Sequence, residues 1–461
     1  MDRNRRDIML SFSPGIHDLI WIFAPAFTAP TFQNVLVLFV GAVMSPQDRT
    51  VTGMLRAAGF LAQKQFTTYH RVFSKRKWSL LLMAFLLGSL VIAVIPPEKP
   101  VVCVVDDTTV RRWGRLIYGR ACHRDPVRST KQKVVHCFGH KWVVLAFAVP
   151  MPFTNRVWSL PVLPLLYRPE EQENAEGKRH HTCIDWARKG SAWLLRKFPT
   201  RHFILIGDGG YNSLVFALWC SKHKDRLSLV SRFHKDAALY ARPPRRKKHQ
   251  RGRPPKKGQR LLSPQQEAQE PGKLWTRAKV AWYNQTIKEV ELIWKNALWY
   301  QPGHDPVPIR WVFIRYQDEK HKLVEECFFS TDQKMKPKQI IEHYITRWSI
   351  ETTFEEVRAH LGLETLENHC ENSIKRSVPA LLGLFSIVAI WFRKQWLLDP
   401  PQLHTAPWYQ KTEPTFGDAL VALRKDLLMH TFFYDPQIRE GLDLIPPTLR
   451  HFFIQRITQA A

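Results

Sequence analysis

Acidic residues and cysteines are both scarce in this sequence of 461 residues. Its 40 aspartates and glutamates face 68 lysines and arginines, which gives a formal net charge of +28. This excess goes beyond what solubility requires and indicates a polyanionic partner. The seven cysteines are odd in number and have no framework spacing. They argue against a disulfide scaffold and favour a reducing compartment.

The N-terminal residues also lack the pattern of a signal peptide. The first residues, MDRNRRDIMLSFSPG, lack a sustained apolar core and a cleavage site. One segment, residues 78–95, is free of charge and long enough to span a membrane by hydropathy. Two prolines end it just before another apolar run. We therefore interpret it as a buried core helix, with a membrane anchor as the alternative.

Aromatic residues are plentiful. There are 17 tryptophans and 27 phenylalanines, and 45% of the sequence is hydrophobic. The positive charge therefore belongs to folded domains and not to a disordered basic chain. The length allows two to four domains, each with a core.

Composition and periodicity divide the chain into five parts. We expect a helical, DNA-binding domain over residues 1–97, in which residues 49–59 and 63–73 have the outline of a helix-turn-helix. An ordinary helical hairpin is the alternative. An α/β core is expected over residues 98–232 and again over 337–399. A basic arm and β-rich insertion over 233–336 separate its two halves, and a helical tail, residues 400–461, follows.

Two buried strands of the predicted core end in carboxylates. The apolar run at residues 101–105 leads into Asp106-Asp107-Thr108-Thr109, and the run at 203–206 leads into Gly207-Asp208. Acids at the mouth of a buried strand are costly unless cations meet them. Helix capping or a tight turn would be the purely structural explanation.

A later helix, residues 344–362, carries four polar side chains on one face. At about 100° per residue, Tyr344, Arg347, Glu351 and Arg358 fall within roughly 60° of one another. An apolar stripe beside them would pack on the core. A ladder of solvated ion pairs would give the same pattern.

The segment between residues 242 and 260 contains ten lysines or arginines, four prolines and no acid. It resembles the short arms that enter the DNA minor groove, with a solvated linker as the alternative. The residues that we expect to contact DNA there are Arg251, Arg253, Lys256 and Lys257.

Aromatic and β-branched residues alternate through residues 275–330, which predicts a β-rich insertion. An aromatic side chain in such an insertion can stack on an unpaired base. Of Trp294, Trp299 and Trp311, we choose Trp299 because it lies near a predicted turn; a core position is the alternative.

Together, Asp107, Asp208 and Glu351 would carry enough negative charge to hold two Mg²⁺ or Mn²⁺ ions through oxygen ligands. In a strongly basic protein, the matching substrate is a phosphodiester. The histidines and cysteines near residues 122–140 give only a weak zinc signal, because no C-x2-C pair accompanies them.

These blocks resemble a known family. A strand followed by DDT, a strand followed by GDGGY, and Y-x2-R-x3-E-x6-R look like the catalytic blocks of bacterial insertion-sequence DDE transposases, in the branch with a Tyr-Arg-Glu-Lys signature. The resemblance spans roughly residues 49–397. It implies an α/β fold: a mixed-sheet core like that of ribonuclease H, interrupted by a β-rich insertion, with a helical domain before it.

The resemblance also implies roles. Asp107, Asp208 and Glu351 would be the catalytic metal ligands, with Asp106 as an alternative to Asp107. Tyr344, Arg347 and Arg358 would contact DNA phosphate. The signature's last residue is lysine in the family, and Arg358 keeps the charge but changes the donor geometry.

The implied reaction is metal-dependent hydrolysis at the element's ends, followed by transfer of the freed 3′-hydroxyl into target DNA. It proceeds by cut and paste, with a DNA hairpin as an optional intermediate, in which an aromatic residue of the insertion holds a flipped base. Double-stranded DNA, a homodimer in the DNA complex and a location in the prokaryotic cytoplasm at the nucleoid are expected. The rival hypothesis is a catalytically inactive or domesticated transposase that only binds DNA.

Overall fold

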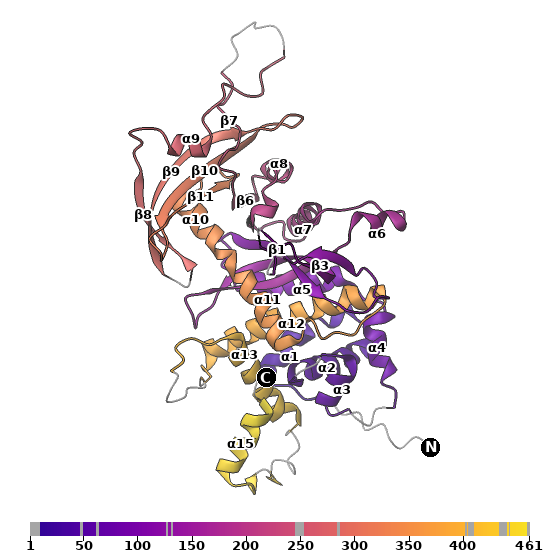
Figure 1. Ribbon diagram of the computed structural model, residues 1–461. Coiled ribbons are helices and arrows are strands. Elements are labelled where there is room, and N and C mark those ends of the chain that lie inside the picture. The colour runs from indigo at the N-terminus through magenta and orange to yellow at the C-terminus, as the bar shows by residue number, and fades with distance from the viewer. Residues whose placement is uncertain are drawn as a thin grey trace.

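In the computed structural model, the regular elements among the described residues before position 101 are all helices (Figure 1). They are α1 (Pro14–Trp21), the 3₁₀ turn η1 (Ala24–Ala26), α2 (Ala29–Met44), α3 (Val51–Ala57), α4 (Thr67–Ser74) and α5 (Leu80–Ile92). The structure describes residues 10–46, 49–60, 64–125, 128–130, 132–244, 253–283, 286–401, 403, 410–432, 440–441 and 443–458.

The apolar segment that raised the membrane alternative forms α5, which has 13 residues. A membrane-spanning helix needs about 20. A second helix, α12 (Glu371–Leu398), is long and apolar enough to cross a membrane by length and composition. Since 72% of its most apolar window is buried inside the protein, α12 is the core helix that its sequence predicts.

A mixed sheet follows the helices. Its core strands are β1 (Val101–Arg111), β3 (His136–Pro150), β4 (Val157–Tyr167), β5 (Phe203–Gly207) and β6 (Leu227–Arg232). Strands β4, β3 and β1 are antiparallel neighbours, and β5 and β6 continue the sheet parallel to β1. This is the strand order of a ribonuclease-H-like core, so the predicted α/β fold class is confirmed.

The β-rich insertion is not a separate body but an extension of the same sheet. Strand β11 (Leu323–Ser330) pairs with β6, and β10 (Val307–Gln317), β9 (Ile287–Trp299), β8 (Thr276–Ala281) and β7 (Leu239–Tyr240) complete it. With the short strand β2 (Ala121–Arg124), the sheet has eleven strands among the described residues. The helix α9 (Pro264–Ala268) lies beside β10.

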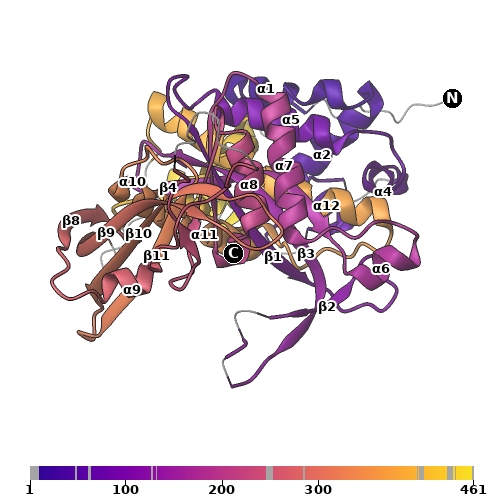
Figure 2. The same ribbon diagram turned by 90° about the horizontal axis from the view of Figure 1, so that it is seen from above.

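Helices cover both faces of the core strands. In Figure 1, α7 (Cys183–Lys197) and α8 (Leu214–Lys222) lie on one side of β1 and β3, and α11 (Trp348–Leu361) and α12 lie on the other. The view from above in Figure 2 shows α7 and α8 in front of the sheet. Helix α10 (Pro337–Thr346) precedes α11, α6 (Glu170–Ala175) precedes α7, and the 3₁₀ turn η2 (Gly209–Tyr211) precedes α8.

The tail, whose role the sequence did not indicate, packs back on the first helices. It contains α13 (Phe416–Leu427), the π-helical turn η4 (Leu428–Phe432) and α15 (Pro447–Thr458). From α13, the buried Arg424 donates hydrogen bonds to the backbone oxygens of Val43 (2.7 Å) and Ser45 (3.0 Å). These carbonyls lie at the C-terminal end of α2, where cations are favourable. The contact joins the helical tail to the N-terminal helices.

Candidate active site between β1, β5 and α11

The two neighbouring aspartates of β1 point to opposite faces of the sheet, as successive residues of a strand must. Asp106 faces α11, because its Oδ2 lies 3.1 Å from Nη1 of Arg347. Asp107 faces the side of α7, where its Oδ2 lies 3.1 Å from Nζ of Lys141. The side chain of Asp106 is 13% exposed and that of Asp107 is 30% exposed.

Asp208 follows β5 directly, at the point where the parallel pairing of β5 with β1 ends, at Gly207 and Val105. Its Oδ1 accepts a hydrogen bond of 2.9 Å from the backbone N–H of Gly210, which fixes the turn. Gly207 is required before it, because a Cβ there would lie 2.7 Å from Tyr211. The negative charge of Asp208 contributes to the raised pKa of Asp106, so the two carboxylates share one electrostatic environment.

The predicted catalytic helix is divided at Arg347 into α10 and α11. Arg347 lies at the junction, where its Nη1 donates to Asp106 at 3.1 Å and to Oε1 of Glu351 at 2.6 Å. The same guanidinium lies 5.8 Å from the ring centre of Tyr344. One cation therefore bridges an acid of the sheet and an acid of the helix.

Burial sets the electrostatics of this group. It raises the pKa of Asp106 to about 7, against the opposing effect of Arg347, and the charges of Asp208 and Asp107 raise it further. Burial lowers the pKa of Arg347, but the carboxylates of Asp106 and Glu351 outweigh this and raise it above its ordinary value. Arg347 therefore stays charged and holds the acids together.

The raised pKa of Asp106 makes stability depend on pH. The folded protein binds this proton more tightly than the unfolded chain, so the contribution is greatest below the ordinary pKa of 3.8 and declines as the pH rises through about 7. Replacing Asp106 with asparagine removes the decline. Between pH 5 and pH 8, the variant should gain about 2–3 kcal/mol relative to the wild type.

Thermal unfolding at both pH values measures this effect. The melting temperature of Asp106→Asn minus that of the wild type should grow by a few degrees from pH 5 to pH 8. Asp107→Asn is the matched control for the loss of one acid from the same strand. A difference that stays constant over this range would contradict the raised pKa of Asp106.

Of the other two residues predicted to contact phosphate, Tyr344 lies in the core and Arg358 lies against β1. Tyr344 is buried and its ring packs on Phe328, with 4.6 Å between ring centres, and burial raises its pKa. Arg358 projects toward β1, where Nη2 donates to the hydroxyl of Thr108 and Nε lies 3.7 Å from Glu364. Thr108 lies on the same face of β1 as Asp106, so Arg358 extends the site along the strand.

The position of Arg347 affects how the acids could bind a metal ion. In the part of the chain that the structure describes, no three His, Cys, Asp or Glu side chains are grouped closely enough to hold a metal ion. The guanidinium of Arg347 occupies the space between Asp106 and Glu351 and serves as a stand-in for a cation. The carboxylate oxygens are the donors that Mg²⁺ and Mn²⁺ prefer, so the chemistry of the acids fits such ions.

The four residues of the predicted DNA-binding arm have different positions. Arg251 lies outside the described residues, and Arg253 is exposed. Lys256 forms an ion pair with Asp305. Lys257 lies between two tyrosine rings, 3.7 Å from the centres of both Tyr240 and Tyr300. Lys257 therefore anchors the base of the arm beside β7 through cation–π contacts.

Trp299 is a core residue, and its assignment as the base-stacking side chain is wrong. It is 2% exposed and makes edge contacts with Phe233 and Phe329 at 5.1 Å and 5.5 Å between ring centres. No base can reach this ring without opening the core. The near-alternating aromatic pattern of β9 fits burial as well as it fits a site.

Replacing Trp299 with alanine should therefore lower the free energy of unfolding by about 3–5 kcal/mol. The reason is a large cavity between β9 and its neighbours. Trp294→Ala on the same strand is the control, because Trp294 is 40% exposed and its loss should cost less than about 1 kcal/mol. Chemical denaturation measures both values, and equal losses would show that Trp299 is not a core residue.

The aromatic side chains near the acids come from a place that the sequence did not single out. Tyr283, just after β8, packs against Trp348 of α11, with 5.7 Å between ring centres. Burial raises the pKa of Tyr283 to about 12, and the charge of Glu351 adds to the shift. The ring of Trp282 packs edge-to-face against Tyr283, with 5.4 Å between ring centres. In the sequence, the adjacent Trp282 and Tyr283 after β8 were the signal that could have indicated these aromatic side chains.

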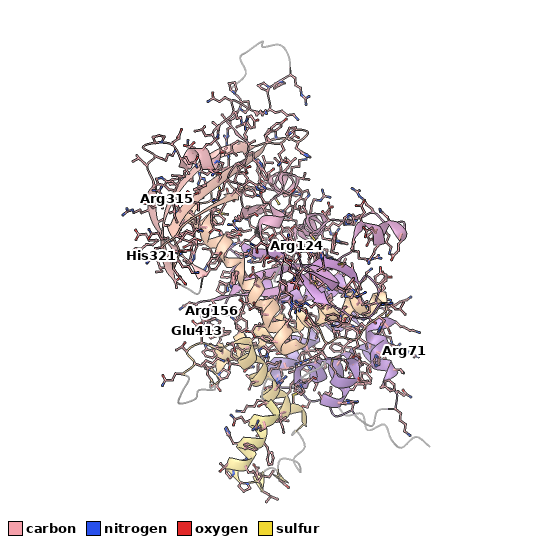
Figure 3. All side chains as sticks on the ribbon, in the orientation of Figure 1. Arg71, Arg124, Arg156, Arg315, His321 and Glu413 are labelled. Carbon is pink, nitrogen blue, oxygen red and sulfur yellow. The ribbon has the colours of Figure 1, made fainter. Side chains whose placement is uncertain are left out.

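These aromatic side chains line one wall of a cleft of about 820 Å³. Its other walls are the end of α10, one face of α11, the loop between β3 and β4, and residues 410–416. Arg156 of that loop and Glu413 both line the cleft and form an ion pair, with 3.5 Å between Nε and Oε2; Figure 3 labels the two residues next to each other. The cleft therefore adjoins the helix of Glu351 and combines aromatic with hydroxyl side chains.

Comparisons with known proteins bear on these features. The family model described as "DDE superfamily endonuclease" matches residues 22–292, which is more than half of the chain and includes Asp106 and Asp208 but ends before Glu351. Among solved structures, the chain is similar to a piggyBac transposase in a cryo-EM synaptic complex with hairpin DNA. The identity is 9% and the TM-score 0.39, over 98% of this chain and 82% of that chain. No curated protein matches the chain in sequence.

Proposed function

Because the chain belongs to the DDE superfamily of endonucleases, we propose that it is a transposase of the insertion-sequence type. It cleaves the phosphodiester backbone at the ends of its element and joins the freed 3′-hydroxyl to target DNA. The net charge of +28 supports double-stranded DNA as its partner. Pairing of two element ends calls for two copies of the chain in the working complex.

The observation that carries this proposal is the arrangement around Arg347. Asp106 and Glu351 both accept a hydrogen bond from the guanidinium of Arg347. The negative charge of Asp208 raises the pKa of Asp106. We therefore assign to Asp106, and not to Asp107, the role of the β1 acid that acts with Asp208 and Glu351. Lys141 neutralises Asp107 on the far face of the sheet.

Three carboxylates of this kind would hold two Mg²⁺ or Mn²⁺ ions. When bound, such ions activate an attacking hydroxyl and stabilise the leaving oxygen of a phosphodiester. The protein's own part is to position the DNA strand. Arg347 and Arg358 lie on the same face as Asp106 and can donate paired hydrogen bonds to phosphate oxygens. Tyr344 is buried beside Arg347 and supports the position of its guanidinium.

This arrangement supports the branch with the Tyr-Arg-Glu-Lys signature, with Arg358 in place of the lysine. Phe328 and Arg347 enclose the ring of Tyr344, which explains why an aromatic residue stands three positions before the arginine. The role of Arg347 then has two parts. Before DNA binds it neutralises the acids, and afterwards it pairs with a phosphate.

Replacing Arg347 with alanine should therefore separate the two functions. The free protein should bind Mn²⁺ more tightly, by about tenfold, because no internal cation competes for Asp106 and Glu351. DNA cleavage should fall by about 100-fold because a phosphate contact is lost. Calorimetric titration with Mn²⁺ and a nicking assay measure the two effects, with Arg358→Ala as the control that lowers cleavage alone. Weaker Mn²⁺ binding by Arg347→Ala would refute this role.

The cleft beside α11 is suited to a flipped base. Tyr283 and Trp348 provide ring faces for stacking, and their position near Glu351 is appropriate for a base next to the cleaved bond. They replace Trp299 as the stacking candidates. A hairpin intermediate would use such a pocket.

A nicking assay tests the proposed function. A supercoiled plasmid that carries the gene with its flanking DNA is incubated with the protein in Mg²⁺ or in EDTA. We expect nicks with free 3′-hydroxyl groups at the element's ends in Mg²⁺ and none in EDTA. A protein that binds this DNA but never nicks it would be the DNA-binding, catalytically inactive form and would overturn the proposal.

A further inference from the structure

The loop between β1 and β2, residues 112–120, presents two apolar side chains to solvent. Trp113 is 82% exposed, whereas the other exposed tryptophans among the described residues, Trp21, Trp294 and Trp348, range from 36% to 49%. Leu116 is 90% exposed. Isolated apolar side chains on a surface are ordinary, but here two strongly exposed ones lie three residues apart on one short loop.

The loop is fixed at several points, so this exposure is not the result of a loose chain. The backbone N–H of Tyr118 donates to the carbonyl of His369 at 3.0 Å, and its hydroxyl donates to Glu371 at 2.9 Å. Nε of Arg120 donates to the carbonyl of Arg112 at 3.0 Å, which closes the loop. The anchors hold the base, while Trp113 and Leu116 project.

Charge identifies the partner. Residues 110–124 contain five arginines and no acid. Arg115 lies between Trp113 and Leu116 in the sequence and is exposed, as is Arg124 at the end of β2, which Figure 3 labels. In the described part of the chain, neither Arg115 nor Arg124 pairs with a carboxylate. A second copy of this basic chain would be repelled here, whereas the phosphates of DNA would be attracted.

We propose that Trp113 and Leu116 form a wedge that enters between base pairs of the bound DNA, with Arg115 pairing to the adjacent phosphates. Apolar side chains flanked by arginine insert between base steps in this way and kink the duplex. The proposal rests on the proposed function, because it assumes that DNA lies along β1. It adds a second point at which the protein deforms its substrate, separate from the acids.

Strand geometry sets where the wedge acts. Trp113 follows Asp106 by seven residues on β1 and its extension. At about 3.3 Å per residue in a strand and about 3.4 Å per base pair, the kinked step lies within about seven base pairs of the cleaved bond. The kink turns the duplex at that distance and sets the angle at which its end enters the site.

The experiment uses duplexes made from the DNA that flanks the gene, each with 2-aminopurine at one position. The fluorescence of this base rises when it is unstacked. All measurements are made in EDTA, so that no cleavage is needed. We expect a rise at one or two neighbouring positions within the stated distance for the wild type and for Trp113→Phe, which keeps an aromatic wedge.

For Trp113→Ala the rise should be lost, and binding should weaken about tenfold. Trp294→Ala, which removes an exposed tryptophan elsewhere, should leave both unchanged. An undiminished signal with Trp113→Ala, or no signal at any position although the wild type binds and nicks DNA, would overturn the wedge and leave the proposed function intact. A change in sedimentation without a change in DNA unstacking would assign the loop to a second copy. Failure of the wild type both to bind and to nick this DNA would remove the wedge and the proposed function together.

Discussion

Replacing Asp106 with asparagine is expected to lower metal-dependent DNA cleavage by about 1,000-fold or more. Asparagine has nearly the same shape but lacks the charge needed to hold a divalent ion beside Asp208 and Glu351. The replaced side chain is 13% exposed and packs against Arg347, so an isosteric change should preserve the fold. The nicking assay in Mg²⁺ measures the loss.

Asp107→Asn is the decisive comparison because it changes the adjacent residue on the same strand. Asp107 lies on the other face, where it pairs with Lys141. Its loss should reduce cleavage by less than about tenfold. If instead Asp107→Asn abolished cleavage and Asp106→Asn did not, the assignment from side-chain direction would be reversed.

Replacing Glu351 with glutamine should be nearly as damaging, with cleavage reduced by about 1,000-fold. Glutamine can still accept the hydrogen bond from Arg347 that Glu351 accepts at 2.6 Å, so the helix position is kept. What is lost is the third negative charge of the site. Because the side chain is 34% exposed, the change should have little effect on folding.

Glu355→Gln provides the control on the same helix. Glu355 lies one turn further along α11 and is exposed. Its loss should leave the cleavage rate within about twofold of the wild type. Equal activity of the wild type and Glu351→Gln would remove α11 from the active site.

The buried strands and the core helix α12 could be predicted because their signals are local. Residues 101–105 and 203–206 are apolar throughout, and an acid follows each run: Asp106 within β1, which continues to Arg111, and Asp208 directly after β5. The same apolar continuity explains why the sequence did not choose between Asp106 and Asp107. A strand buried on both faces has no polar alternation that tells which face a given residue occupies. In the folded chain Asp106 pairs with Arg347 and Asp107 with Lys141, and the proposed choice of Asp106 rests on this tertiary pairing.

Other features depend on contacts between distant segments. The break between α10 and α11 has neither proline nor glycine at residue 347, and it occurs where Arg347 reaches Asp106, 241 residues away in the sequence. The pairing of Val230 with Ser330, which fuses the insertion with the core sheet, has no local signal either. Trp299 was misassigned because alternating aromatic residues mark a strand equally well whether one face or both faces are covered.

The most direct measurement is the position of a bound ion. Crystals of the protein soaked in Mn²⁺ and measured at the manganese absorption edge should show an anomalous peak between the carboxylates of Asp106 and Asp208, with the guanidinium of Arg347 displaced from Glu351. A peak on the side of Asp107 and Lys141, or binding of Mn²⁺ that involves none of Asp106, Asp208 and Glu351, would contradict the account.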